Sequence, residues 1–95
     1  MIVTFKQWKC WVDVGRYLFG GSRIELVDAE DGSPVATATS NLDGLTRGCV
    51  AIKDYSENEG MLKVLVDAGI VSEPIEFRKQ GFVTFPICKL LKGGE

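Results

Sequence analysis

Residues 2–19 are rich in β-branched and aromatic residues and read as an extended segment, in which side chains alternate between two faces with a period of two. One face of such a strand would carry the apolar series Trp8, Cys10, Val12 and Val14. The opposite face would carry Lys9, Trp11 and Asp13. Gly15 is a candidate break, so the segment is either one bent strand or two short strands.

The clearest turn signal lies in the stretch RIELVDAEDGSPVATATSN. Residues 24–27 and 35–39 are strand-like, and Asp31-Gly32 between them supplies the left-handed backbone that a tight turn requires. Residues 41–48 are rich in turn formers, and residues 49–53 form another short apolar run. The pattern therefore predicts a hairpin, a loop and a further strand.

A helical period occupies residues 56–68, with an apolar stripe at Met61, Leu62, Leu65 and Val66. Ser56 and Glu59 have the spacing of a capping box, in which Ser56 caps the first turn and Glu59 reaches back to its amide. Gly69 stands where a left-handed residue would end the helix. We expect one amphipathic helix here.

The last third returns to strand-like patterns. Ile75 and Phe77 alternate with Glu76, and residues 82–88 form a final strand that Pro86 would confine to an edge or a bulge. Residues 91–95 read as a frayed tail. The whole chain thus predicts a single α+β domain, residues 1–95: a mainly antiparallel sheet of about five to six strands with the helix packed on one face.

Composition excludes more chemistry than it suggests. The 95 residues include no histidine, which removes the commonest general base and the commonest metal ligand. The three cysteines, Cys10, Cys49 and Cys88, are widely spaced, form no CxxC pair and lie among apolar neighbours. We interpret them as buried, reduced thiols, and we expect no catalytic residue, no cofactor and no metal site.

Acidic residues gather in the middle of the chain, although the net charge is only −2. The candidates for an acidic binding surface are Asp28, Glu30, Asp31, Asp43, Asp54, Glu57 and Glu59. Such a surface would meet a partner protein with a basic surface, and its sign argues against direct binding of nucleic acid. The alternative is that these acids serve turns and the start of the helix.

Trp11 is the candidate anchor among the aromatic residues. Trp8 and Trp11 are three positions apart in a strand-like stretch, so they point to opposite faces. One helix cannot cover both faces of a sheet, so one tryptophan would remain partly exposed. An exposed Trp11 would suit a protein interface, whereas ordinary core packing of both tryptophans is the alternative.

The stretch from residue 28 to residue 91 resembles small, functionally unassigned domains encoded by bacteriophages and mobile elements of gut-type bacteria. The resemblance rests on DAEDGSPVATATSNL, VAIKDYSENEGMLKVLVDAGIV and GFVTFPICKLL. It implies an inhibitor or modulator of a host protein, of the anti-defence or anti-CRISPR type, that acts in the bacterial host cytosol. It assigns no catalytic residue.

No apolar run approaches the roughly 20 residues that cross a bilayer, and the start MIVTFKQWKCW does not resemble a signal peptide, so we expect a cytoplasmic protein that does not bind membranes.

Three functions stay open on the sequence. The first is a non-catalytic protein-binding domain that uses the acidic surface. The second is an assembly module that forms a homodimer or larger oligomer through a strand edge or an exposed Trp face. The third is a small enzyme or ligand-binding domain, which requires a pocket of roughly 300 Å³ or more with convergent carboxylates.

Overall fold

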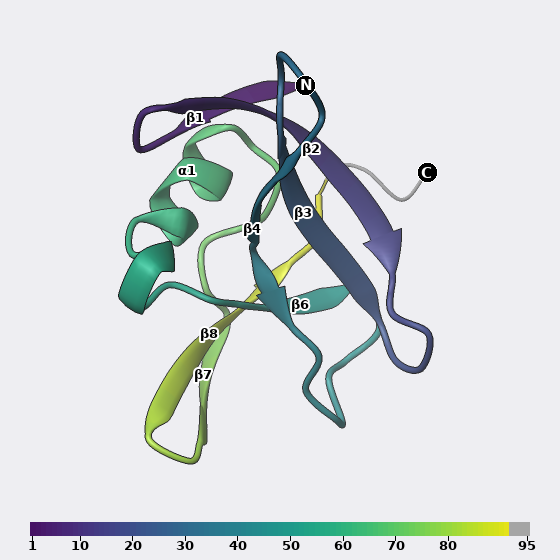
Figure 1. Ribbon diagram of the computed structural model, residues 1–95. Coiled ribbons are helices and arrows are strands. Elements are labelled where there is room, and N and C mark those ends of the chain that lie inside the picture. The colour runs from purple at the N-terminus through teal and green to yellow at the C-terminus, as the bar shows by residue number, and fades with distance from the viewer. Residues whose placement is uncertain (92–95) are drawn as a thin grey trace.

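The computed structural model describes residues 1–91, which form two four-stranded antiparallel sheets and one short α-helix (Figure 1). The α+β class is confirmed. The strands number eight in two sheets, more than the five or six expected in one sheet. The expected frayed tail falls mostly on residues 92–95, outside the described residues, while the Leu91 amide donates to the Ile70 carbonyl at 2.8 Å.

The first sheet has the order β1-β2-β3-β4 and the second has the order β5-β6-β8-β7. The strands of the first sheet are β1 (Ile2–Phe5), β2 (Trp8–Arg16), β3 (Ser22–Asp28) and β4 (Pro34–Thr37). Those of the second are β5 (Thr39–Ser40), β6 (Cys49–Ile52), β7 (Glu76–Gln80) and β8 (Val83–Lys89).

The extra strands arise from two breaks in the predicted ones. Lys6 adopts a positive φ of 56°, so the first predicted strand is broken by a turn at Lys6-Gln7. The strand is not broken at Gly15, which lies inside β2. Ala38 separates β4 from β5: its amide donates to Ile24 of the first sheet, and its carbonyl accepts from Lys53 beside the second sheet. One predicted strand therefore changes sheets at Ala38 and connects the two layers.

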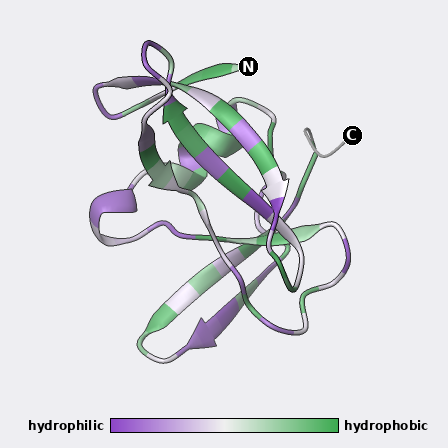
Figure 2. Cartoon of the chain, turned by 45° about the vertical axis from the view of Figure 1, so that its right-hand side comes forward, coloured by the Kyte–Doolittle hydropathy of each residue, from purple (hydrophilic) through white to green (hydrophobic). Residues whose placement is uncertain are grey.

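The main core lies between the two sheets. Green and purple bands alternate along the long strands of the first sheet (Figure 2), as expected where one face is buried and the other is wet. The buried members come from both sheets and from the helical segment: Val3, Phe5, Cys10, Ile24, Leu26, Ala38, Val50, Ile52, Met61, Leu65, Ile70, Val71 and Cys88.

A smaller core lies on the opposite face of the second sheet. Leu42 from the β5–β6 loop covers Ala51, Phe85 and Ile87 there, with Cys49 at its edge. The Phe85 ring meets Tyr55 edge to face, with ring centres 5.9 Å apart. The loop thus acts as a cover that the sequence pattern did not predict.

The helix is shorter than predicted. A 3₁₀ turn occupies Ser56–Asn58, and α1 spans only Met61–Asp67. Gly60 separates the two with a left-handed φ of 95°, and Ser56 makes no capping hydrogen bond, so the predicted capping box is wrong. Met61 and Leu65 point into the main core, where α1 contacts β1.

The prediction for Pro86 also needs correction, because β8 lies between β6 and β7 and is not an edge strand. The pairing of β6 with β8 stops at Ile87, so Pro86 has a registered neighbour only in β7, at Phe77. Proline has no backbone N–H to donate, and Pro86 stands where β8 no longer pairs with β6, so no hydrogen bond of that ladder is lost.

Within residues 1–91, no helix is both long and apolar enough to span a bilayer.

Candidate functional site

The acidic residues of the β3–β4 turn stabilise their own backbone. Asp28 Oδ1 accepts the Glu30 amide at 2.8 Å, and Asp31 Oδ1 accepts the amide and the hydroxyl of Ser33 at 2.9 and 2.7 Å. These bonds from Ser33 lower the pKa of the Asp31 carboxyl. Gly32 supplies the left-handed residue of the turn, with φ of 76°. The predicted turn is present, and two of these acids are engaged in it.

The acids before the helix lie in a second region. Asp54 Oδ1 accepts the amides of Gly60 and Leu62 at 3.1 and 3.0 Å and so caps the first turn of α1. Glu57 is exposed, and its carbonyl accepts from the Lys6 ammonium at 2.7 Å. Glu59 is exposed. Asp54 thus performs the role that the sequence pattern assigned to Ser56.

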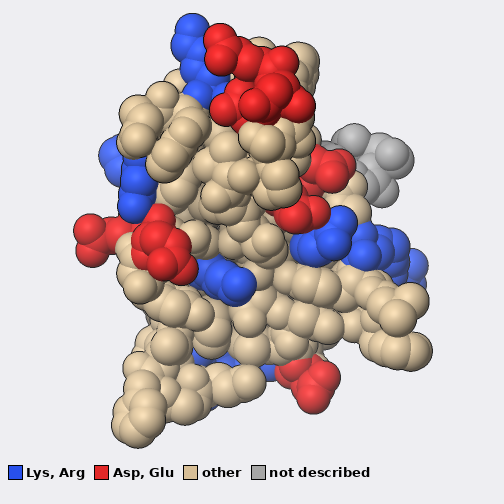
Figure 3. All heavy atoms as spheres, viewed as in Figure 1, with Lys and Arg blue, Asp and Glu red and all other residues tan. Residues whose placement is uncertain are grey.

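Asp43 lies apart from both groups, in the β5–β6 loop, where its carbonyl accepts from Arg78 at 2.9 Å. Figure 3 shows the acidic side chains of one face in several groups, with neutral and basic surface between them. The seven candidate acids come from three separate segments of the fold. On this face they do not form one continuous acidic surface.

A cavity of about 300 Å³ beside α1 bears on the ligand-binding alternative. Its acidic lining consists of Asp54, Asp67 and Glu73. Asp54 caps the helix, and Asp67 pairs with Lys63 at 2.8 Å, a contact that raises the pKa of the Lys63 ammonium. Of these three acids, Glu73 alone has no side-chain hydrogen bond or ion pair in the described part of the chain. The two-carboxylate mechanism of glycoside hydrolysis needs a pair of such groups. Residues 1–91 hold no cluster of three metal-ligating side chains.

The three cysteines are buried and reduced. Burial, with a smaller contribution from the Glu73 carboxylate, raises the pKa of Cys88 to about 11. Burial and the nearby Asp28 carboxylate raise the pKa of Cys10. Thiols held protonated in this way are poor nucleophiles, in agreement with their role as small apolar side chains.

Trp11 lies on the outer face of the first sheet, where 48% of its surface is exposed. In the strand register it stands opposite Ile2 of β1 and Val27 of β3. Side chains directly opposite each other on antiparallel strands share a face and touch. Ile2, Trp11 and Val27 therefore form an apolar row across three strands, and 51% of the Ile2 surface is exposed as well.

Polar residues flank this apolar row on the same face. Lys9 pairs with Thr4 on one side, and Asp13 pairs with Glu25 on the other. Arg23 forms an ion pair with Glu25 at 3.0 Å. An apolar centre with a rim of mixed charge is the usual anatomy of a protein interface.

The sequence pattern placed Trp11 correctly on the face opposite Cys10, which is fully buried. It missed Ile2 and Val27 as members of the same surface. Trp8 belongs to the buried face by alternation, yet 39% of its surface is exposed at the start of β2. The signal that could have found the apolar row is the strand register, which no short-range pattern encodes.

Comparison with known protein families, characterised proteins and solved structures finds no match to this chain.

Proposed function

We propose that this chain is a non-catalytic protein-binding domain that docks through the outer face of its first sheet. The observation that carries the proposal is the apolar row of Ile2, Trp11 and Val27 on this face, in which Ile2 and Trp11 are exposed and Val27 is half-buried. A tryptophan at the centre of a paired sheet face presents a large rigid surface at low entropic cost, and tryptophan dominates the hot spots of protein interfaces.

The surface chemistry favours a protein as the partner. The rim of Lys9, Asp13 and the Arg23–Glu25 ion pair carries both signs of charge, which suits a mosaic protein surface better than a uniformly charged polymer. An acidic docking surface has less support, because Asp31 and Asp54 serve the turn and the helix and the acids are separated.

The resemblance of residues 28–91 to domains of mobile elements supplies the proposed setting. In that setting the partner is a host protein in the bacterial cytosol, and the domain inhibits or modulates it by covering a surface. This part of the proposal is supported by the resemblance alone, whereas the docking face is supported by the geometry of the sheet.

Self-association through the same face is the alternative that the apolar row also supports. Pairing at strand edges has less support: β1 is only four residues long, and β7 carries Arg78 and Lys79, the kind of charged edge that blocks strand addition. The question is therefore whether Trp11 meets another protein or a second copy.

The test compares the tagged wild-type protein with Trp11→Ala in capture from bacterial lysate and in sedimentation velocity. Phe82→Ala is the matched control, because Phe82 is a fully exposed aromatic residue at the β7–β8 turn, away from the apolar row. We expect a partner that survives high salt, binds Phe82→Ala normally and binds Trp11→Ala at least about 30-fold more weakly.

Three results would contradict this proposal. Equal capture of the same partner by wild type and Trp11→Ala would show that the partner does not dock on the face that carries Trp11. A second result is a partner that no longer binds at high salt. If that partner also fails to bind the triple variant Asp28→Asn, Glu30→Gln and Asp31→Asn, the acidic residues form the docking surface instead. Concentration-dependent dimers that vanish in Trp11→Ala would identify the assembly module instead.

A further inference from the structure

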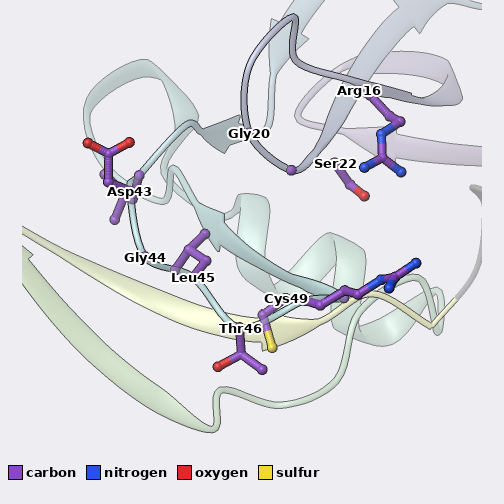
Figure 4. Close-up of a pocket in the computed structure, with 12 residues that line it drawn as sticks. Arg16, Gly20, Ser22, Asp43, Gly44, Leu45, Thr46 and Cys49 are labelled. Atoms are coloured by element: carbon purple, nitrogen blue, oxygen red, sulfur yellow. The ribbon is translucent and has the colours of Figure 1, made fainter.

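A second cavity, of about 450 Å³, lies between the end of the β2–β3 hairpin and the β5–β6 loop (Figure 4). Arg16 and Ser22 line it from the hairpin, and Arg47 and Thr46 line it from the loop. Arg16 and Ser22 are directly paired in the register of β2 and β3, and Figure 4 shows their side chains together on the same side of the cavity.

These two residues interrupt the apolar pattern of the buried face. Positions 10, 12 and 14 of β2 and positions 24 and 26 of β3 are apolar and pack in or against the main core. By alternation, the next positions of that face are Arg16 and Ser22. Arg16 is exposed and Ser22 is half-buried, so a charged and a hydroxyl side chain border the cavity where the core ends.

The cavity has a positive end. Within residues 1–91 the ion pairs involve Arg23, Lys63 and Arg78, and none involves Arg16 or Arg47. Of the described residues that line the cavity, Asp43 is the one acidic residue, and Figure 4 places it at the opposite end from Arg16. Two guanidinium groups therefore line this space without a carboxylate partner among residues 1–91.

Hydrogen bonds hold both walls in place. The Asn41 side chain donates to the Phe19 carbonyl at 2.7 Å and so joins the loop to the hairpin. The Arg78 guanidinium holds the Asp43 carbonyl at 2.9 Å. Gly20 allows the close approach, since a Cβ there would clash with the Asn41 side chain. The cavity is thus preformed, which lowers the entropic cost of binding a ligand.

We propose that this cavity binds the phosphoryl group of a small phosphorylated molecule of about nucleotide size. Guanidinium groups match phosphate oxygens in pairs, and hydroxyl groups such as that of Ser22 complete such contacts. The volume exceeds that of one phosphate and falls in the usual range for small-molecule sites. A nucleic-acid strand fits less well, because the chain carries a net charge of −2 and such binders present an extended basic surface.

The test is titration calorimetry with sodium tripolyphosphate and with ATP at constant ionic strength, supported by amide chemical shifts. We expect saturable binding of at least one of the two, with shifts at Gly20–Ser22 and Arg47–Gly48. Arg16→Gln and Arg47→Gln should each weaken binding by about tenfold or more, the usual effect of losing a charge-assisted hydrogen bond. Lys79→Gln is the control, since it removes the same charge at an exposed position of β7.

The proposal is overturned if neither compound binds at millimolar concentration, or if Lys79→Gln weakens binding as much as Arg16→Gln. Tighter binding of a short single-stranded oligonucleotide than of either small compound would also overturn it. Trp11→Ala should bind the phosphorylated probes like wild type, so failure of this site and failure of the docking face are distinguishable.

Discussion

At the scale of single residues, three of the seven candidate acids bind backbone amides near them through their side chains. Asp28 and Asp31 accept amides two positions ahead and shape the β3–β4 turn, while Asp54 accepts two amides at the start of α1. Such local bonds account for the positions of Asp28, Asp31 and Asp54 in the turn and before the helix. Cys88 is completely buried and packs in the core as a protonated thiol.

The Cys88 thiol makes stability depend on pH in the alkaline range. Its pKa of about 11 lies above the ordinary value of 9.0 that it regains when unfolding exposes it. Between these values the unfolded chain releases a proton that the folded chain retains. We expect the free energy of unfolding to be unaffected by this group below about pH 9 and to fall as the pH rises toward 11.

Urea unfolding at about pH 8 and about pH 10.5 measures this loss. Cys88→Ala should reduce the pH dependence by about one proton relative to wild type, while the raised pKa of Cys10 leaves part of it in place. The same pH dependence in both proteins would show that Cys88 titrates normally.

At the scale of elements, α1 depends on contacts at both ends because it has only seven residues. Isolated helices of this length are unstable in water. At its end Gly69 is left-handed, with φ of 72°, and the amides of Gly69 and Ile70 donate to Val66 and Leu65, which is a Schellman motif. Ile70 is buried, so this end of the helix is also attached to the core.

Loss of the Asp54 cap should destabilise the fold. Asp54→Ala leaves the amides of Gly60 and Leu62 without their acceptor, and we expect a loss of about 1 kcal/mol in the free energy of unfolding, measured with urea. Glu59→Ala is the control, because its side chain is exposed and makes no capping bond; its effect should stay within about 0.5 kcal/mol. If Glu59→Ala lowers the free energy of unfolding more than Asp54→Ala does, the helix is capped by Ser56 and Glu59, as the sequence pattern predicted.

At the scale of the whole molecule, both sheets depend on one shared core. Leu26 of β3, Ile52 of β6 and Leu65 of α1 all belong to it and are completely buried. The chain passes from the first sheet to the second at Ala38. A substitution that destabilises one sheet should therefore also destabilise the other, through the shared core and the shared backbone. We therefore expect the described domain to unfold as one unit.

Leu26→Ala tests this coupling. Truncation of a fully buried leucine should cost about 2–5 kcal/mol, and amide exchange should show protection falling in β6 and β8 as much as in β2 and β3. Phe82→Ala, at a fully exposed position, should leave both unchanged. Loss of protection in the first sheet alone would mean that the two layers unfold separately.

The sequence alone determined the local features of this protein: the alternation that places Trp11 opposite Cys10, the turn at Asp31-Gly32, and the helix end at Gly69. These features depend on residues close together in the chain, because side-chain alternation and left-handed turns are properties of the local backbone.

Only the tertiary structure decided which distant residues share a surface. The division into two sheets, the register that lines up Ile2, Trp11 and Val27, and the cavity that Arg16 lines together with the β5–β6 loop all depend on contacts between remote segments. Alternation along the chain assigns each side chain to a face of its strand. Which strands pair, and in which register, depends on the packing energy of whole strands, to which residues far apart in the chain contribute.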